Sequence, residues 1–190
     1  NGTEIVTPAT NNLGVGIDAL DSITTGDYNT ALGDGALTAT EDGQQNLAIG
    51  RNTLTANVGG HYNVAIGDMA LITSVSGTSN VAVGKGSLGL VSTGSHNTAI
   101  GEASLYATTG SSNVGIGKEA GNNITSGSSN IIIGPSVSAV SATGSNQLNI
   151  GNTIYGDLST GDIWTKTTGK IKMKGSFMQS STHQALTLGY

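Results

Sequence analysis

A five-residue motif, Asn-x-Ala-aliphatic-Gly, recurs at a nearly constant spacing along this chain. Clear copies occupy residues 29–33, 46–50, 63–67, 80–84 and 97–101, and looser copies end at Gly16, Gly117, Gly134 and Gly151. Successive closing glycines are 17 residues apart, except for one interval of 16 between Gly101 and Gly117. Such a period is typical of stacked-repeat proteins, in which each unit contacts only its neighbours.

The composition also differs from that of an ordinary globular domain. Charged residues make up 10% of the 190 residues, against about a quarter in typical domains, and there is no cysteine to form disulfide bonds. The net charge is −5, so the chain lacks the basic character of a nucleic-acid-binding protein. No apolar run approaches the ~18 residues of a membrane span. We therefore expect a repeat protein with no nucleic-acid partner and no membrane insertion.

Each repeat is predicted to form one turn of an all-β solenoid. The aliphatic motif bounded by turn formers predicts a short strand, and the following pair of a small residue and leucine, such as Thr53-Leu54, predicts a second. Two glycines per repeat predict reversals of the chain, because glycine adopts positive φ without steric cost. We divide the chain into a lead-in segment (1–11), a repeat shaft or head (12–151) and a β-rich C-terminal cap or tip (152–190).

Two columns of polar residues indicate how the turns are held in register. The residue after each motif glycine alternates in sign through six repeats and forms a predicted structural ladder: Asp34, Arg51, Asp68, Lys85, Glu102 and Lys118. Opposite charges on neighbouring parallel strands favour the correct order of turns. The motif asparagines have two equally weighted explanations, namely local turn chemistry or a stacked ladder of side-chain amides.

The predicted core is thin for a single chain. Each turn supplies two large aliphatic residues, for example Ile49 and Leu54, and the position three after the leucine does not repeat an apolar residue. A left-handed hexapeptide β-helix, the main single-chain rival, requires three aliphatic positions per turn. We therefore favour a flatter coil of two strands per turn that completes its core by association with other copies.

The repeats resemble those of two families of fibrous proteins. The run from Asn97-Thr-Ala-Ile-Gly101 to Gly134 is similar to the left-handed parallel β-roll in the heads of trimeric autotransporter adhesins. The passage from Ser128-Ser-Asn-Ile-Ile-Ile-Gly134 through Gly144-Ser-Asn-Gln-Leu-Asn-Ile-Gly151 to Gly156 resembles bacteriophage tail-fibre proteins. The resemblance implies an intertwined homotrimeric fibre that attaches to a host or surface. It places the chain in a virion tail fibre or an extracellular appendage.

The C-terminal segment has a different composition. It contains Trp164, Phe177 and an alternating stretch at 170–174 that predicts a half-buried strand. Trp164 could stack on a sugar ring, although filling the centre of a trimer is the commoner role for such an aromatic residue. We expect this segment to close the shaft or to begin a further module.

The sequence offers little catalytic chemistry. Asp34 and Asp68 are predicted two turns apart, but Arg51 between them would keep both ionised, and neither has the apolar environment that a general acid needs. The three histidines, His61, His96 and His183, lack the spacing of a metal site. His61 and His96 lie before a motif asparagine, in a loop column shared with Tyr28 and Tyr62. We expect no enzyme activity, no cofactor and no metal.

The expected function is therefore structural and adhesive, with a cell-surface receptor, in particular a glycan, as the partner. The alternatives are a tailspike-like enzyme that degrades surface polysaccharide and a purely mechanical shaft spacer. The candidate binding residues are exposed loop and tip side chains: Tyr28, His61, Tyr62, His96, Tyr106 and Trp164.

Overall fold

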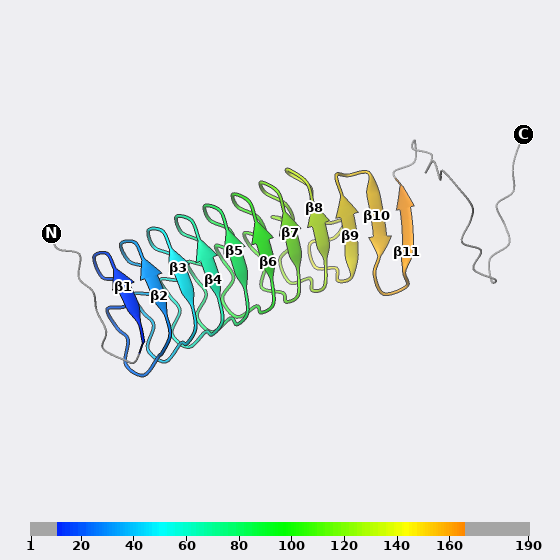
Figure 1. Ribbon diagram of the computed structural model, residues 1–190. Coiled ribbons are helices and arrows are strands. Elements are labelled where there is room, and N and C mark those ends of the chain that lie inside the picture. The colour runs from blue at the N-terminus through cyan, green and yellow to red at the C-terminus, as the bar shows by residue number, and fades with distance from the viewer. Residues whose placement is uncertain (1–10, 166–190) are drawn as a thin grey trace, which may run out of the picture.

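The computed structural model describes residues 11–165 and shows an all-β solenoid of about eight turns. Each turn contributes one short strand, and all strands belong to a single sheet in chain order (Figure 1). The strands are β1 Leu13–Val15, β2 Thr30–Leu32, β3 Leu47–Ile49, β4 Val64–Ile66, β5 Val81–Val83, β6 Thr98–Ile100, β7 Val114–Ile116, β8 Ile131–Ile133, β9 Gln147–Ile150, β10 Ile154–Asp157 and β11 Asp162–Thr165. The described residues contain no helix, and hence none that is long and apolar enough to cross a membrane.

Strands β1 to β9 pair in parallel and place equivalent motif positions side by side. Ala31 of β2 lies beside Ala48 of β3, which lies beside Ala65 of β4. The pairing of β6 with β7 keeps this register across the one shorter repeat, because Ala99 lies beside Gly115. The missing residue is therefore absorbed in the loop between these strands.

The interior of the coil is filled by one chain. The six leucines of the leucine column are completely buried: Leu20, Leu37, Leu54, Leu71, Leu88 and Leu105. The motif alanines face the same interior, where a larger side chain would not fit between the strand and the leucine. The residue three positions after the leucine also points inward, although its type varies: Ile23, Thr40, Asn57, Ser74, Val91 and Thr108. In the next turn Gly121 replaces the leucine, and Ile124, three residues later, is likewise buried.

This arrangement corrects the predicted core. Ile49 was expected to pack inside with Leu54, but it is only half-buried and lies on the outer side of the strand, whereas Ala48 is fully buried. Side chains alternate across a strand, so the two residues that flank a buried alanine must both face outward. A single chain thus closes its own interior, and the large aliphatic residues of the motif form the outer face of the sheet.

The predicted second strand is absent from the described turns, because the leucines adopt a left-handed backbone conformation. Leu54 has φ 50°, and the other five leucines of the column have φ between 48° and 58°. This conformation costs about 1–2 kcal/mol for a residue with a side chain, which the complete burial of a leucine can offset. The backbone still bonds to the next turn, since the Leu54 NH donates to the Ala70 carbonyl at 3.0 Å.

The two glycine columns have different roles. The motif glycines do adopt positive φ, for example 129° at Gly50, as predicted. The second column does not require positive φ but leaves no space for a side chain. A Cβ atom on Gly77 would lie 2.6 Å from the Gly94 carbonyl oxygen of the next turn. This second column allows the turns to approach closely rather than reversing the chain.

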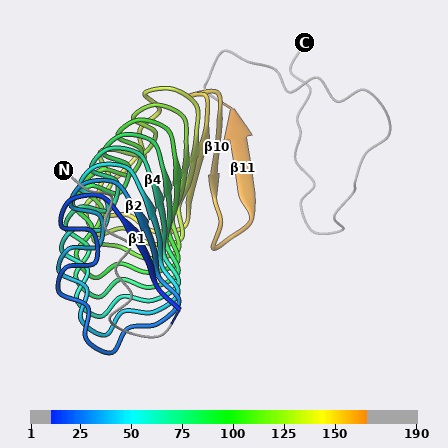
Figure 2. The ribbon, with the colours of Figure 1, turned by 60° about the vertical axis from the view of Figure 1, so that its left-hand side comes forward.

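After β9 the sheet continues as an antiparallel meander of β10 and β11. In Figure 2 the turns are seen as stacked closed loops with the strands aligned along one side, and β10 and β11 extend this side beyond the last turn. The C-terminal segment therefore begins with two strands that continue the sheet of the solenoid. The expected strand at 170–174, together with Phe177 and His183, lies outside the described residues.

Candidate functional site

The motif asparagines form a buried ladder of amides that runs through the stack. The Asn63 backbone NH and Nδ2 donate to Oδ1 of Asn46 at 2.9 and 3.1 Å, and Asn80 binds Asn63 in the same way. Nδ2 of Asn63 also donates to the Gly77 carbonyl at 2.8 Å. The ladder ends at Gln147, which binds Asn130 through both its backbone and its side chain. Of the two explanations of this column, the stacked ladder is therefore observed, and the same amides also fix the loops.

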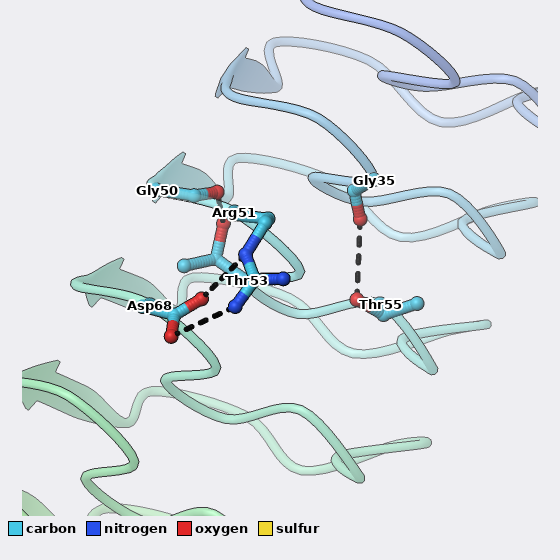
Figure 3. A network of polar contacts seen from close by, with 6 residues as sticks. All are labelled: Gly35, Gly50, Arg51, Thr53, Thr55 and Asp68. Carbon is cyan, nitrogen blue, oxygen red and sulfur yellow. Dashed lines mark hydrogen bonds and ion pairs between the residues drawn. The ribbon is translucent and has the colours of Figure 1, made fainter.

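The charged column lies on the surface beside the strands and is paired only in part. Arg51 forms a bidentate ion pair with Asp68 at 3.1 and 3.3 Å, as Figure 3 shows. Nζ of Lys118 lies 3.4 Å from Oε2 of Glu102. Lys85 stands between these two pairs and makes no ion pair within residues 11–165.

Asp34, at the start of the column, has a backbone partner instead of a charged one. Its Oδ1 accepts a hydrogen bond from the Ile17 NH at 3.1 Å. Thr55, on the turn between Asp34 and Asp68, donates to the Gly35 carbonyl at 3.1 Å (Figure 3). Side chain-to-backbone bonds between turns therefore supplement the ion pairs in setting the register.

Three of the predicted binding residues share one exposed corner of the coil. Tyr28, Tyr62 and His96 each stand directly before a motif asparagine, with φ near 60°, and all three are exposed. Each is two turns from the next, and Gln45 and Ser79 occupy the same position on the turns between them. The aromatic groups therefore form a spaced row along the stack.

His61 does not belong to this row, although the sequence analysis placed it there. It lies one position earlier than Tyr62, and its Nδ1 accepts a hydrogen bond from the Gln44 NH at 3.0 Å. Its ring centroid is 6.2 Å from that of Tyr62. His61 thus holds a loop on the preceding turn.

Tyr106 lines a slot on another part of the coil. The slot has a volume of about 220 Å³ and is lined by Met69, Ile72, Lys85, Gly86, Glu102 and Tyr106, among others. The sequence analysis identified Tyr106 and the two charged residues but not the apolar wall. The sequence does contain a local signal for the slot. In the repeat that follows Gly84, the buried Ser87-Leu88 pair has a glycine on each side, Gly86 and Gly89, and no other repeat has glycines at both positions.

Trp164, on β11, lies at a smaller hollow of about 140 Å³ near the end of the sheet. Gln147, Asn146 and Asp157 also line it and supply amide and carboxylate groups. The Asp157 carboxylate accepts bonds from the hydroxyl and NH of Ser159, and these bonds hold the pKa of Asp157 below its ordinary value. The six predicted binding residues therefore do not form one site, because Tyr28, Tyr62 and His96, with His61 beside Tyr62, lie along one loop column whereas Tyr106 and Trp164 line two different hollows.

No cluster of three or more histidine, aspartate or glutamate side chains able to hold a metal ion occurs between residues 11 and 165. No protein-family model matches the chain, and searches of curated proteins and of solved structures find no significant similarity.

Proposed function

We propose that this chain is a segment of a homotrimeric adhesive fibre that attaches a virion or a cell-surface appendage to a cell-surface receptor, in particular a glycan. The proposed fibre consists of three left-handed solenoids with a regular 17-residue repeat, mounted in a virion tail fibre or an extracellular appendage. Its role is structural and adhesive rather than enzymatic.

The observation that carries the proposal is the apolar outer face of the sheet. Its aliphatic residues flank the buried central residue of each strand from β1 to β8: Leu13, Val15, Leu32, Leu47, Ile49, Val64, Ile66, Val81, Val83, Ile100, Val114, Ile116, Ile131 and Ile133. Every one of them is half-buried or exposed in the single chain, and Leu32 is 48% exposed. Parallel sheets are normally covered on both faces, and a contiguous apolar face of this kind marks an interaction surface.

A second and third copy of the chain are the partners that suit this face. The face runs the length of the stack, so a partner must offer an apolar surface of equal length. Another copy of this face meets that requirement, and closed symmetry around a shared axis would cover all copies equally. The resemblance to trimeric fibre repeats supports three copies rather than two.

Sedimentation equilibrium of the full chain tests the assembly. We expect a mass of about 57 kDa, three times the 18.9 kDa of one chain. The double variant Leu32→Asp/Ile100→Asp places charges on the apolar outer face and should sediment as a monomer. The matched control Val75→Asp/Leu90→Asp alters two loop residues of similar exposure, 43% and 46%, and should remain trimeric. A monomeric wild-type chain would contradict the proposal.

Adsorption tests the attachment role. Fluorescently labelled protein is incubated with bacterial cells that differ in their surface polysaccharide, and bound protein is counted by flow cytometry. We expect adsorption to depend on the polysaccharide and to occur without release of reducing ends from the purified polymer. Release of reducing ends would indicate a polysaccharide-degrading enzyme, and absence of adsorption to all cells would leave only the spacer role.

A further inference from the structure

The slot beside Tyr106 forms where two glycines of one turn face an aromatic ring of the next turn. Gly86 and Gly89 lack side chains at the two surface positions of their turn, and the Tyr106 ring of the next turn occupies part of the resulting gap. A Cβ atom on Gly89 would lie 2.5 Å from Cε2 of Tyr106, and one on Gly86 would lie 3.7 Å from the same atom. Tyr106 is nevertheless 40% exposed, so part of its surface stays available to a ligand.

The wall opposite Tyr106 is apolar. Met69 and Ile72, which lie two turns before Tyr106, line the slot together with it. The volume of about 220 Å³ is below the ~300–1,000 Å³ of sites for drug-sized ligands. An aromatic surface and two aliphatic side chains suit the C–H face of one pyranose ring, which is apolar although its edge carries hydroxyl groups.

The charged residues at the slot differ in whether they have an ion-pair partner. Lys85 and Glu102 both line the slot, but Glu102 forms an ion pair with Lys118 at 3.4 Å. Asp68, on the other side of Lys85, is bound by Arg51. Both acidic neighbours of Lys85 in the charged column therefore have other partners. The exposed Lys85 ammonium remains without an ion pair in the described part of the chain and complements an anionic group on the ligand.

We propose that this slot binds a hexuronic acid residue of an acidic polysaccharide, with the pyranose ring against Tyr106, Met69 and Ile72 and the sugar carboxylate at Lys85. The inference rests on the proposed attachment function, for which it supplies the class of ligand. None of the lining residues belongs to a strand. The slot and the apolar outer face of the sheet therefore consist of different residues, so sugar binding at the slot is compatible with association of copies through the sheet.

Methyl NMR of the full chain tests the slot with two matched probes, methyl β-D-glucuronide and methyl β-D-glucoside. They differ by a carboxylate in place of a hydroxymethyl group. We expect saturable shifts of the Met69 and Ile72 methyl signals, and an affinity about fivefold higher for the glucuronide, as one partly exposed ion pair would give. Equal affinities, or no shift at either residue, would overturn the proposal.

Variants separate the two parts of the slot. Lys85→Gln should remove the preference for the glucuronide without removing the binding of either sugar, whereas Lys85→Arg, which keeps the positive charge and leaves Asp68 and Glu102 with their present partners, should keep the preference. Gly89→Ala should displace the Tyr106 ring and weaken the binding of both sugars, whereas Asn122→Ala, at the equivalent position two turns further along, should not. A preference that persists in Lys85→Gln would show that Lys85 does not hold the carboxylate.

Combining the NMR titration with the adsorption assay on the same protein distinguishes failure of the slot proposal from failure of the attachment proposal. Polysaccharide-dependent adsorption without glucuronide binding would overturn the slot and leave the fibre function intact. Glucuronide binding without adsorption to any cell would support the slot and contradict the attachment role.

Discussion

Asn63 donates two hydrogen bonds to the single Oδ1 atom of Asn46, from its backbone NH at 2.9 Å and from its side-chain amide at 3.1 Å. The same geometry recurs between successive motif asparagines as far as Asn130. Each buried amide thus binds the turns on both sides of it. Loss of one asparagine should therefore disturb more than its own turn.

Asn63→Ala is expected to lower the free energy of unfolding by about 3 kcal/mol. It removes the two bonds that the Asn63 side-chain amide donates to Asn46 Oδ1 and to the Gly77 carbonyl. It also leaves the backbone NH and Nδ2 of the buried Asn80 without their acceptor, Oδ1 of Asn63. Urea denaturation at a fixed protein concentration measures the loss. Asn122→Ala, on the exposed surface, should change the value by no more than about 0.5 kcal/mol, and an equal loss in both variants would contradict this role of the ladder.

Gly77→Ala should destabilise the solenoid by about 1–3 kcal/mol, the usual cost of overpacking. The added Cβ would lie 2.6 Å from the Gly94 carbonyl oxygen, which belongs to the backbone of the next turn and cannot rotate away. Gly59→Ala is the matched control. There the new atom would meet the Asp42 carboxylate at 2.9 Å, and this exposed side chain can move. Equal melting temperatures of the two variants would contradict the close approach of the turns.

Thr40→Val should stabilise the protein by about 1 kcal/mol. Thr40 is completely buried and its hydroxyl oxygen has no hydrogen-bond partner, so a methyl group of the same size removes the cost of an unsatisfied polar atom. Thr53→Val should have the opposite sign, because the equally buried Thr53 hydroxyl donates to the Gly50 carbonyl at 3.0 Å. Thermal denaturation of both variants gives the comparison, and a loss of stability in Thr40→Val would show that its hydroxyl has a partner.

The ion pair between Arg51 and Asp68 should contribute less than about 1 kcal/mol, because both side chains are partly exposed to solvent. A double-mutant cycle with Arg51→Gln and Asp68→Asn isolates the coupling energy between them. Screening should reduce this energy further at about 1 M salt. A coupling energy that salt does not change would show that the pair is shielded from solvent, for example by a neighbouring chain.

Ser159→Ala should raise the pKa of Asp157 toward the ordinary value of 3.8, because the Ser159 hydroxyl and NH bonds lower it. A carboxylate with a depressed pKa in the folded state stabilises that state above pH 3.8 and loses this effect as the pH falls through the depressed value. The stabilising effect of the ionised Asp157 on the β10–β11 hairpin should therefore be lost only below pH 3.8. Carboxyl ¹³C shifts during a pH titration measure the pKa, and Ser159→Thr, which keeps the hydroxyl, should leave it unchanged.

The sequence predicts the stacking of the turns well, because a constant period allows little else. It predicts the direction of side chains poorly. Ile49 is the larger and more apolar neighbour of Ala48, yet the small residue faces the interior. The reason is steric, since the fully buried Leu54 of the same turn already occupies the space that a second large side chain would need. Where Gly121 replaces this leucine, the larger Ile132 faces the interior. The leucines of the leucine column also adopt positive φ, which residue preferences disfavour and which tertiary packing nevertheless imposes.

The candidate sites could be predicted only as individual residues. Tyr106 is conspicuous as an aromatic residue in a loop, but the slot depends on two glycines that belong to another turn, Gly86 and Gly89. Absent side chains leave no chemical signature in a sequence. Which neighbours in the charged column form ion pairs likewise depends on side-chain rotamers. The sequence therefore could not predict that Lys85 has no ion-pair partner among the described residues.

The bonds between turns run along the long axis of the stack, and this orientation has a mechanical consequence. A pull on the two ends would load successive turns in series, so that they would detach one at a time and each would release about 58 Å of extended chain. The last parallel turn does not end in an open edge, because β10 and β11 continue its hydrogen bonding. The pairing of β10 with β9 must therefore break before the parallel turns can detach from the C-terminal side.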